Sequence, residues 1–487
     1  MPQNKQVIGY LPDERPPVWK LVLYALQQVI VMFPATVTVA LITGFQVSTT
    51  IFASGLATLC FLLITGRKIP LYYGSSFSYL SAVAGLMANE AIQNRLSPEA
   101  IEQVKLWAAN QSIVLPSEAI SYAQFGIIMS GLVSIVAGLV VKYFGHNAVE
   151  KVLPPTITGS IALVIGLTLA DNALGDAAPV PLAEGAEFTM ANSNWVWVVS
   201  LVTFFSTILF TRYLKGFLGQ LPLLLGAGVG CLSAALLYFI GGDSYNLFRP
   251  LEAAAVEASL WSAGPIAVPA FSLPKASLAS VMAIMPVAIA TIPESTAHMY
   301  QLDVYVNDLA KKKGKDKKYN LISLLDRNLI GDGLADMISG VVGGPAGTNY
   351  GENISTMAVT KVFSVSVLFL AAIFAMILSF FTPLIKAIYA IPQPVIGGLE
   401  IYLFGAIAAQ GIAIMIDKKV DMFSAKNIAV IASVMIIGLG GEFQFGGNIP
   451  VFGIKVPCIA AAAIFGIIVN LILSIGEKRK AKEVEVA

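Results

Sequence analysis

Charged side chains are scarce in this sequence. Asp, Glu, Lys and Arg together account for 12% of its 487 residues, whereas an average soluble domain has about 25%. Cysteine, with three residues, and histidine, with two, are scarcer still. The three cysteines are too few for a secreted disulfide scaffold, and the 56% of apolar residues exclude a disordered chain. The same composition excludes a nucleic-acid-binding surface.

Long apolar runs dominate the sequence instead. A helix needs about 20 apolar residues to cross the hydrocarbon core of a bilayer. Eleven clear runs, a shorter run at 328–343 and two more polar stretches at 69–88 and 345–361 give fourteen candidate spans. We therefore predict an all-α polytopic membrane protein whose surroundings are a lipid bilayer.

The basic residues support this count. With fourteen spans and a cytoplasmic N-terminus, 24 of the 30 Lys and Arg residues fall on the cytoplasmic side. This is the positive-inside pattern, and leaving out either weak span would destroy it. The pattern predicts a multi-pass protein of the cell (inner) membrane with both termini in the cytoplasm.

The two halves of the chain resemble each other in short pieces. SGLATL at 54–59 matches DGLADM at 332–337, and YYGSSFSYL at 72–80 matches NYGENISTM at 349–357. Seven spans per repeat is an odd number, so the second repeat is inverted, as in many secondary transporters. The predicted parts are a cytoplasmic N-terminal tail (1–20), a first seven-span repeat (21–240), an external loop (241–275), a second seven-span repeat (276–475) and a cytoplasmic C-terminal tail (476–487).

The third span of each repeat is the poorly apolar one, at 69–88 and 345–361. Short, Gly- or Pro-interrupted segments in matching positions of two repeats point to a binding site near the bilayer midplane. Non-helical backbone is tolerated there only where it lines a cavity, and its free N–H groups can then bind a ligand.

Ionisable residues inside the spans are the candidate functional groups, because a carboxylate at mid-depth costs at least about 2.5 kcal/mol. Glu294 and His298 are four residues apart and share a helix face. We interpret them as a substrate-binding and proton-relay pair, with a bracing ion pair as the alternative. Pro293 also frees backbone at this point.

Glu352 stands in a Tyr350-Gly351-Glu352-Asn353 stretch at an expected strand-to-helix junction. Its carboxylate is expected to bind a ligand, or alternatively to cap the following half-helix. Asp332 and Asp336 also share a helix face. For them we favour structural hydrogen bonding over proton coupling.

Several catalytic motifs are absent. The sequence has no GxxxxGK[ST], no HExxH and no GxSxG. ATP-driven transport, an intramembrane metalloenzyme and a serine hydrolase are therefore unsupported. We predict that the chain is not an enzyme and needs no cofactor or metal.

At YGENI (350–354) and PESTAH (293–298) the chain resembles the nucleobase–ascorbate transporter family, in its bacterial uracil-permease branch. LQQVIVMFPATV in the first span and IPLYYGSSFSYL in the third extend the resemblance, which covers nearly the whole chain. It implies a core domain of spans 1–4 and 8–11 and a gate domain of spans 5–7 and 12–14. Spans three and ten would begin as short antiparallel β-strands. It also implies proton-coupled uptake of a nucleobase, most simply uracil, by a symporter that is commonly a homodimer.

By motif, the resemblance places Glu294 and Glu352 at the two substrate-binding glutamates and His298 at a histidine one turn after the first. Glu294, His298 and Glu352 would couple transport to protons. Backbone N–H groups at Phe77 and Gly351 would meet the base. Further expected substrate contacts are Tyr350, Phe404 and Glu400.

The chain departs from the family pattern at Gln28, Pro34, Pro293, Glu400 and Phe404. Glu400 stands where a serine is usual. There it would bind an additional N–H or hold a second proton, or else lie in a wetted outer vestibule without contacts. A purine permease for xanthine or urate is the nearest alternative function. An anion transporter of related architecture is disfavoured, because the midplane charges are acidic.

Overall fold

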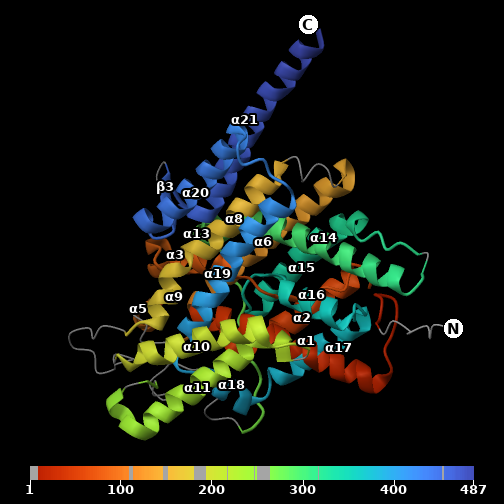
Figure 1. The fold of residues 1–487 in the computed structure, drawn as a ribbon. Coiled ribbons are helices and arrows are strands. Elements are labelled where there is room, and N and C mark those ends of the chain that lie inside the picture. The colour runs from red at the N-terminus through yellow and green to blue at the C-terminus, as the bar shows by residue number, and fades with distance from the viewer. Residues whose placement is uncertain are drawn as a thin grey trace, which may run out of the picture.

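The computed structural model describes residues 9–108, 113–145, 152–179, 194–216, 218–245, 247–248, 264–315, 317–451 and 454–486. Helices account for most of this part (Figure 1). Ten helical segments within it are long and apolar enough to cross a membrane, and Phe77–Met87 and Val365–Leu378 are shorter apolar helices. The chain is therefore an integral membrane protein.

The helices of the first half are α1 (Val18–Thr43), α2 (Val47–Ile64), α3 (Leu80–Met87), α4 (Glu90–Gln93), α5 (Pro98–Ala108), α6 (Ser117–Phe144), α8 (Pro155–Thr168), α9 (Ala170–Ala177), α10 (Trp195–Tyr213) and α11 (Pro222–Gly241). Those of the second half are α13 (Leu278–Ile284), α14 (Ala288–Lys312), α15 (Leu325–Val342), α16 (Gly351–Thr360), α17 (Val365–Leu378), α18 (Thr382–Tyr389), α19 (Gln393–Asp417), α20 (Ala425–Phe445) and α21 (Cys458–Val486).

Proline and glycine set many of the helix ends. Pro154 and Pro392 are the N-caps of α8 and α19, where a missing N–H costs nothing because the first turn has no intrahelical acceptor. Gly44 and Gly343 end α1 and α15 in the left-handed conformation, with φ of 73° and 101°, which glycine adopts without a Cβ clash.

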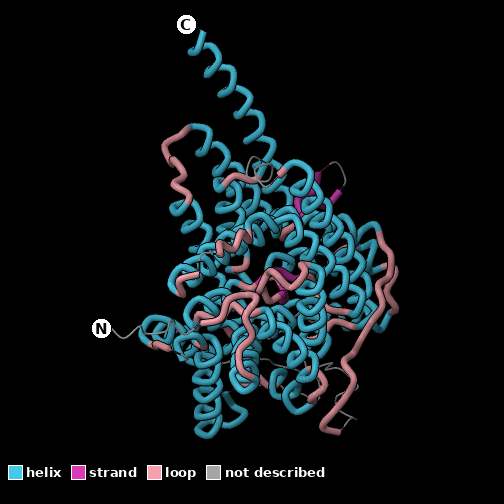
Figure 2. Tube along the Cα trace, turned by 90° about the vertical axis from the view of Figure 1, so that its right-hand side faces the viewer, coloured by secondary structure: helices cyan, strands magenta, loops and turns pink. Residues whose placement is uncertain are grey.

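Two short strands pair in the interior of the molecule. β1 (Tyr73–Ser75) pairs antiparallel with β2 (Gly347–Asn349), with Tyr73 opposite Asn349 and Ser75 opposite Gly347. Both strands are buried, and one strand pair lies at the centre of the helical mass (Figure 2). β1 leads through the 3-10 helix η1 (Phe77–Tyr79) into α3, and β2 leads into α16. The pair joins the two polar stretches noted in the sequence.

Glycines allow several helices to touch through their backbones. A Cβ on Gly333 of α15 would lie 2.2 Å from the carbonyl oxygen of Gly131 on α6. A Cβ on Gly411 of α19 would lie 2.4 Å from the carbonyl oxygen of Gly159 on α8. Both distances exclude any side chain, so these crossings depend on the absence of a Cβ. They hold α6 against α15 and α8 against α19.

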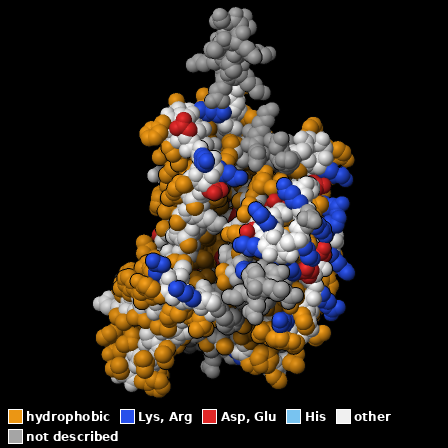
Figure 3. Space-filling model, turned by 45° about the vertical axis from the view of Figure 1, so that its right-hand side comes forward, with side chains coloured by type: hydrophobic (Ala, Val, Ile, Leu, Met, Phe, Trp, Pro, Cys, Tyr) orange, Lys and Arg blue, Asp and Glu red, His pale blue; other side chains and the backbone are white. Residues whose placement is uncertain are grey.

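The surface is largely apolar, as a lipid-facing surface must be. Figure 3 shows hydrophobic side chains over wide areas, while Lys and Arg gather on one flank. Exposed apolar side chains include Phe239 of α11 at 85% and Ile436 of α20 at 73%. In water such large patches would cause association, whereas lipid covers them without penalty.

A polar contact ties the N-terminal segment to the loop after α14. Glu14 accepts hydrogen bonds from Lys313 and Lys315, each at 2.6 Å, and Asp13 accepts one from Lys317 at 2.7 Å. The lysine-rich stretch is therefore partly neutralised within the protein. It fastens the end of α14 to the start of the chain.

Candidate functional site

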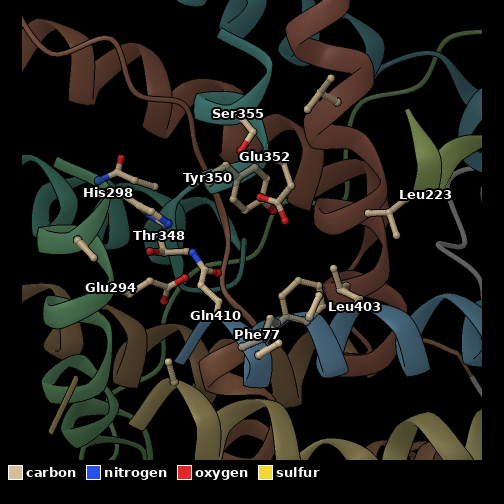
Figure 4. Close-up of a pocket in the computed structure, with 18 of the residues that line it drawn as sticks. Phe77, Leu223, Glu294, His298, Thr348, Tyr350, Glu352, Ser355, Leu403 and Gln410 are labelled. Carbon is tan, nitrogen blue, oxygen red and sulfur yellow. The ribbon is translucent and has the colours of Figure 1, made fainter. Parts of the chain in front are cut away.

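A cavity of about 710 Å³ lies between two sets of helices. One wall comes from α1, β1 with η1, α14, and β2 with α16, and the other from α8, α10, α11 and α19. The polar and aromatic side chains at its wall come from both sets of elements, and several of them are labelled in Figure 4. They are Ser75, Phe77, Ser78, Thr158, Thr211, Glu294, His298, Gln301, Thr348, Asn349, Tyr350, Glu352, Ser355, Thr356, Tyr402 and Gln410.

Two carboxyl groups open into this cavity from different helices. Glu294 comes from the middle of α14 and Glu352 from the first turn of α16 (Figure 4). Both side chains are half-buried, and each lies near enough to act electrostatically on the other. Pro293 removes one N–H from the helix just before Glu294. At Glu352 the N–H groups of the first turn have no intrahelical acceptor, so the helix end favours a negative charge.

His298 lies one turn after Glu294 and also lines the cavity. The side chain is 4% exposed, and among the described atoms its Nδ1 has no hydrogen-bond partner. A Cβ on Gly351 would lie 3.0 Å from Nε2 of His298. Glycine at 351 thus lets the imidazole of α14 approach the start of α16, next to Glu352.

Aromatic groups close one side of the cavity. The Phe77 ring lines it and meets the Phe404 ring edge-on, with centroids 5.5 Å apart and planes at 74°. Tyr350 also lines it, while its hydroxyl donates to the carbonyl of Ser75 at 3.1 Å and pairs with Thr36 Oγ1 at 2.9 Å. Because these bonds hold the phenol to α1 and β1, the Tyr350 ring is a fixed part of the wall.

A buried polar network lies behind the two strands. The Asp332 carboxyl accepts from Ser295 through Oδ2 and from Asn349 Nδ2 through Oδ1 at 2.8 Å. The Asp336 carboxyl accepts from the Tyr73 hydroxyl and from the Gly347 N–H at 2.8 Å, both through Oδ1. These bonds fasten β1 and β2 to α15 and α14, which is the structural role that the sequence favoured for the two aspartates.

The structure brings most of the expected site residues together. Those at the cavity wall are Glu294, His298, Phe77, Tyr350, Gly351 and Glu352. Phe404, 1% exposed, lies behind Phe77 instead of at the wall.

Glu400 does not line the cavity either. It is fully buried on α19, which differs from both of its expected settings. A vestibule would leave it wet, and a place in the substrate site would put it at the wall.

Other polar groups at or near the cavity were not among the expected site residues. Thr348 and Gln410 line the cavity (Figure 4), and Asn353 donates to Gln28 Oε1 at 2.7 Å. Asn349 and Asn353 flank the YGE stretch, so the sequence motif around Glu352 could have pointed to them. Gln410 stands in an ordinary apolar helix, and only the tertiary structure turns it to the cavity.

The chemistry of the cavity is that of a binding site for a small polar molecule. Carboxylate acceptors, free N–H groups at a helix start and an apolar ring meet in one space. Among the described residues, no group of three or more His, Cys, Asp or Glu side chains is placed to hold a metal ion. Fold and site together define a membrane carrier with a central pocket in which polar groups stand among apolar ones.

Comparison with known proteins gives the family. A sequence profile described as Permease family (Xan_ur_permease) matches residues 19–447. The chain belongs to this permease family and is a transporter, not an enzyme.

Two named relatives of this chain are also permeases. The chain is 33% identical over 474 residues to a uracil permease of Bacillus caldolyticus, covering 96% of this chain and 95% of that protein. It is 32% identical to the putative pyrimidine permease RutG of Escherichia coli K12, covering 95% and 91%. The transmembrane domain of the cyanobacterial bicarbonate transporter BicA shares its fold, with a TM-score of 0.58, 14% identity and coverage of 92% and 98%.

Proposed function

We infer that this protein imports a nucleobase, most simply uracil, together with protons by alternating access across the inner membrane. The proposal rests chiefly on one observation. Glu294 and Glu352 line the same cavity, beside the Phe77 ring. The relatives named uracil permease and pyrimidine permease support a pyrimidine as the substrate.

The hydrogen-bonding groups of uracil match those at the cavity wall. Uracil is neutral and planar, with two N–H donors and two carbonyl acceptors. A carboxylate accepts its N–H groups, and backbone N–H groups at Gly351 or Phe77 donate to its carbonyls. The Phe77 ring stacks on its face. A base with a different pattern would leave a buried group unpaired, at a cost of about 1–3 kcal/mol.

Proton coupling rests on the same groups. Glu294 and Glu352 act on one another electrostatically, and His298 stands one turn from Glu294. Placing a proton on one member of such a set changes the charge that the others experience. Substrate binding and proton binding then depend on each other, as a symporter requires.

For the whole molecule we propose fourteen spans in a 7+7 inverted repeat, with β1 and β2 interrupting the third and tenth spans near midplane. The core domain (spans 1–4 and 8–11) would carry the two glutamates, and the gate domain (spans 5–7 and 12–14) the opposite wall. Both termini would be cytoplasmic and the assembly a homodimer. The positive-inside distribution of Lys and Arg supports this orientation.

A purine such as xanthine or urate is the second candidate substrate. The cavity of about 710 Å³ has room for a bicyclic base, since pockets of about 300–1,000 Å³ hold ligands of that size or larger. The relatives' names favour the pyrimidine.

The test is an uptake panel of radiolabelled uracil, xanthine, adenine and urate in cells lacking their own permeases. We expect uracil uptake that an acidic exterior stimulates and a protonophore abolishes. Uptake that ignores the protonophore and requires Na⁺ would contradict proton coupling. Preference for xanthine or urate would make the protein a purine permease.

A further inference from the structure

Three residues on one face of α19 meet the end of α9. Gln393, Gly397 and Glu400 follow one another at helical spacing of four and three residues. Gln393 Nε2 donates to Asp176 Oδ1 at 2.7 Å. A Cβ on Gly397 would lie 2.2 Å from the Ala177 nitrogen, so the two backbones are in direct contact.

Glu400 is an unusual residue at this contact. Its side chain is 0% exposed, and neither carboxyl oxygen receives a hydrogen bond from a described N–H or O–H donor. Oε1 of Gln393 is buried and also without a donor. A buried carboxylate without donors is one of the most costly groups a protein can hold. The Glu400 carboxyl therefore needs a partner other than the N–H and O–H donors of the described residues.

The partner that faces Glu400 is another carboxyl, that of Asp176. The other acid of α9, Asp171, is exposed and five residues away. α8 has no titratable side chain in its sequence. α10 meets α19 through Ser200 and Thr203 at Gly398, and α11 through Gly230 near Val395. No described basic group is among those that act on Glu400.

Two carboxylates cannot hydrogen-bond to one another, because both are acceptors. One proton between them turns the contact into an O–H···O⁻ hydrogen bond and removes one of two like charges, as in other carboxyl pairs that share a proton. A bound metal cation would need about six oxygen ligands, whereas the direct contact of two carboxyls needs only a proton.

We propose that Asp176 and Glu400 form a proton-binding site, separate from the substrate cavity, that joins α9 to α19. The proton enters from and returns to water through Asp176, which is half-buried, while Glu400 lies behind it. With the proton bound, α9 and α19 are hydrogen-bonded; without it, two negative charges, one of them fully buried, repel each other across the contact. The site does not depend on which base is carried.

The experiment uses purified full-length protein in lipid nanodiscs and the variants Glu400→Gln and Glu118→Gln. The infrared carbonyl band of protonated carboxyl groups and the unfolding temperature are both recorded as functions of pH, with and without Na⁺. Gln at 400 keeps a donor for Asp176 but holds no exchangeable proton. Glu118, which pairs with Lys275 at 3.1 Å, is the matched acid without this role.

We expect wild-type protein to lose part of the carboxyl band as pH rises and to lose unfolding temperature over the same range. The native state binds a proton that separated, ionised acids would not, so its stability falls with pH. Glu400→Gln should lose the part of both changes that belongs to the Asp176–Glu400 pair, and Glu118→Gln should keep both changes in full. Uracil affinity should stay within about twofold in Glu400→Gln, because the site is outside the cavity.

Asp176→Asn provides a second route if Glu400→Gln does not fold. Asn removes the like charge and offers an N–H to Glu400. The pH at which the carboxyl band is lost should therefore fall by about one unit or more. An unchanged pH-dependent band in Glu400→Gln would overturn the proposal. So would a Na⁺-dependent rise in stability that Glu400→Gln abolishes, because the site would then hold a metal cation. A more than tenfold loss of uracil affinity in Glu400→Gln would show that the pair belongs to the substrate site.

Discussion

Gln28 on α1 accepts, through Oε1, a hydrogen bond of 2.7 Å from Nδ2 of Asn353 on α16. The Gln28 carbonyl accepts a second bond from the same nitrogen at 3.0 Å. Asn353 directly follows Glu352, so α1 holds the first turn of the helix that presents the Glu352 carboxyl. Gln28 is thus a positioning residue that lies outside the cavity wall.

Gln28→Ala should weaken uracil binding about fivefold, because one buried hydrogen bond is worth about 1 kcal/mol. Binding of radiolabelled uracil to purified protein measures the change. Gln124 is the control, since it is equally buried but bonds to Ser272 and Gly340 away from the cavity. Gln124→Ala should lower the unfolding temperature and leave the affinity unchanged. Equal affinity losses in both variants would contradict a positioning role for Gln28.

Glu352→Gln should weaken uracil binding by one to two orders of magnitude, a loss of about 1.4 kcal/mol for each factor of ten. The amide keeps the shape but replaces one acceptor oxygen with a donor that faces the substrate's own N–H. Ser355→Ala, one turn later at the same wall, should change the affinity by less than about threefold. Unchanged affinity in Glu352→Gln would place the binding site elsewhere.

Glu294→Ala should abolish uracil binding, because it removes a substrate acceptor. His298→Ala should retain binding but fail to accumulate uracil against a gradient, since the relay partner of Glu294 is lost. Equilibrium binding and concentrative uptake in proteoliposomes separate the two effects. Gln301→Ala, also at the wall of the cavity, should accumulate uracil as wild type does. Normal accumulation by His298→Ala would reject the coupling role of the histidine.

Asp332→Asn should destabilise the protein more than Asp336→Asn. Donors reach both oxygens of Asp332, so an amide nitrogen at either position faces a donor and leaves it unpaired, at about 1–3 kcal/mol. The Tyr73 and Gly347 donors reach the same oxygen of Asp336, and an asparagine oxygen can accept both. Thermal unfolding of the two variants tests the order, and the reverse order would contradict the hydrogen-bond assignment.

The contact between the N-terminal segment and the lysine-rich loop should depend on acid pH. Burial opposes ionisation of Glu14, but hydrogen bonds from Lys313 and Lys315 outweigh it and lower the pKa of Glu14 from 4.5 to about 2. A group with a lowered pKa in the folded state contributes stability above its unfolded pKa and loses it as pH falls toward the folded pKa. The difference in unfolding temperature between wild type and Glu14→Gln should therefore shrink from pH 5 to pH 2.

Asp308→Asn is the control for this pH dependence. Its carboxyl pairs with Lys312 on the same helix, and both side chains are about half exposed, so the pair contributes little. Asp308→Asn should match the wild type at every pH. A pH-independent difference for Glu14→Gln would indicate that the bonds to the lysines contribute nothing to folding.

Local chemistry along the chain was enough to predict a membrane protein and several of the residues that line its cavity. Apolar runs of helical length and the scarcity of charged residues are compatible only with a lipid environment for these segments. A carboxylate in such a run is so costly that Glu294 and Glu352 stood out as functional groups. The stretches around Gly74 and Gly347 were too polar and glycine-rich for ordinary spans, which marked the places where β1 and β2 form.

Only the tertiary structure decided which of these residues meet. Glu294 and Glu352 are 58 positions apart, and their shared cavity exists because β1 pairs with β2 and Gly351 admits His298. The sequence could not show that Phe404 supports Phe77 from behind, that Gln410 turns to the cavity, or that Glu400 turns away from it toward Asp176. Helical periodicity says which residues share a face, but the direction of that face depends on packing between distant segments. In this chain that packing is set by close backbone contacts at Gly131, Gly333 and Gly397.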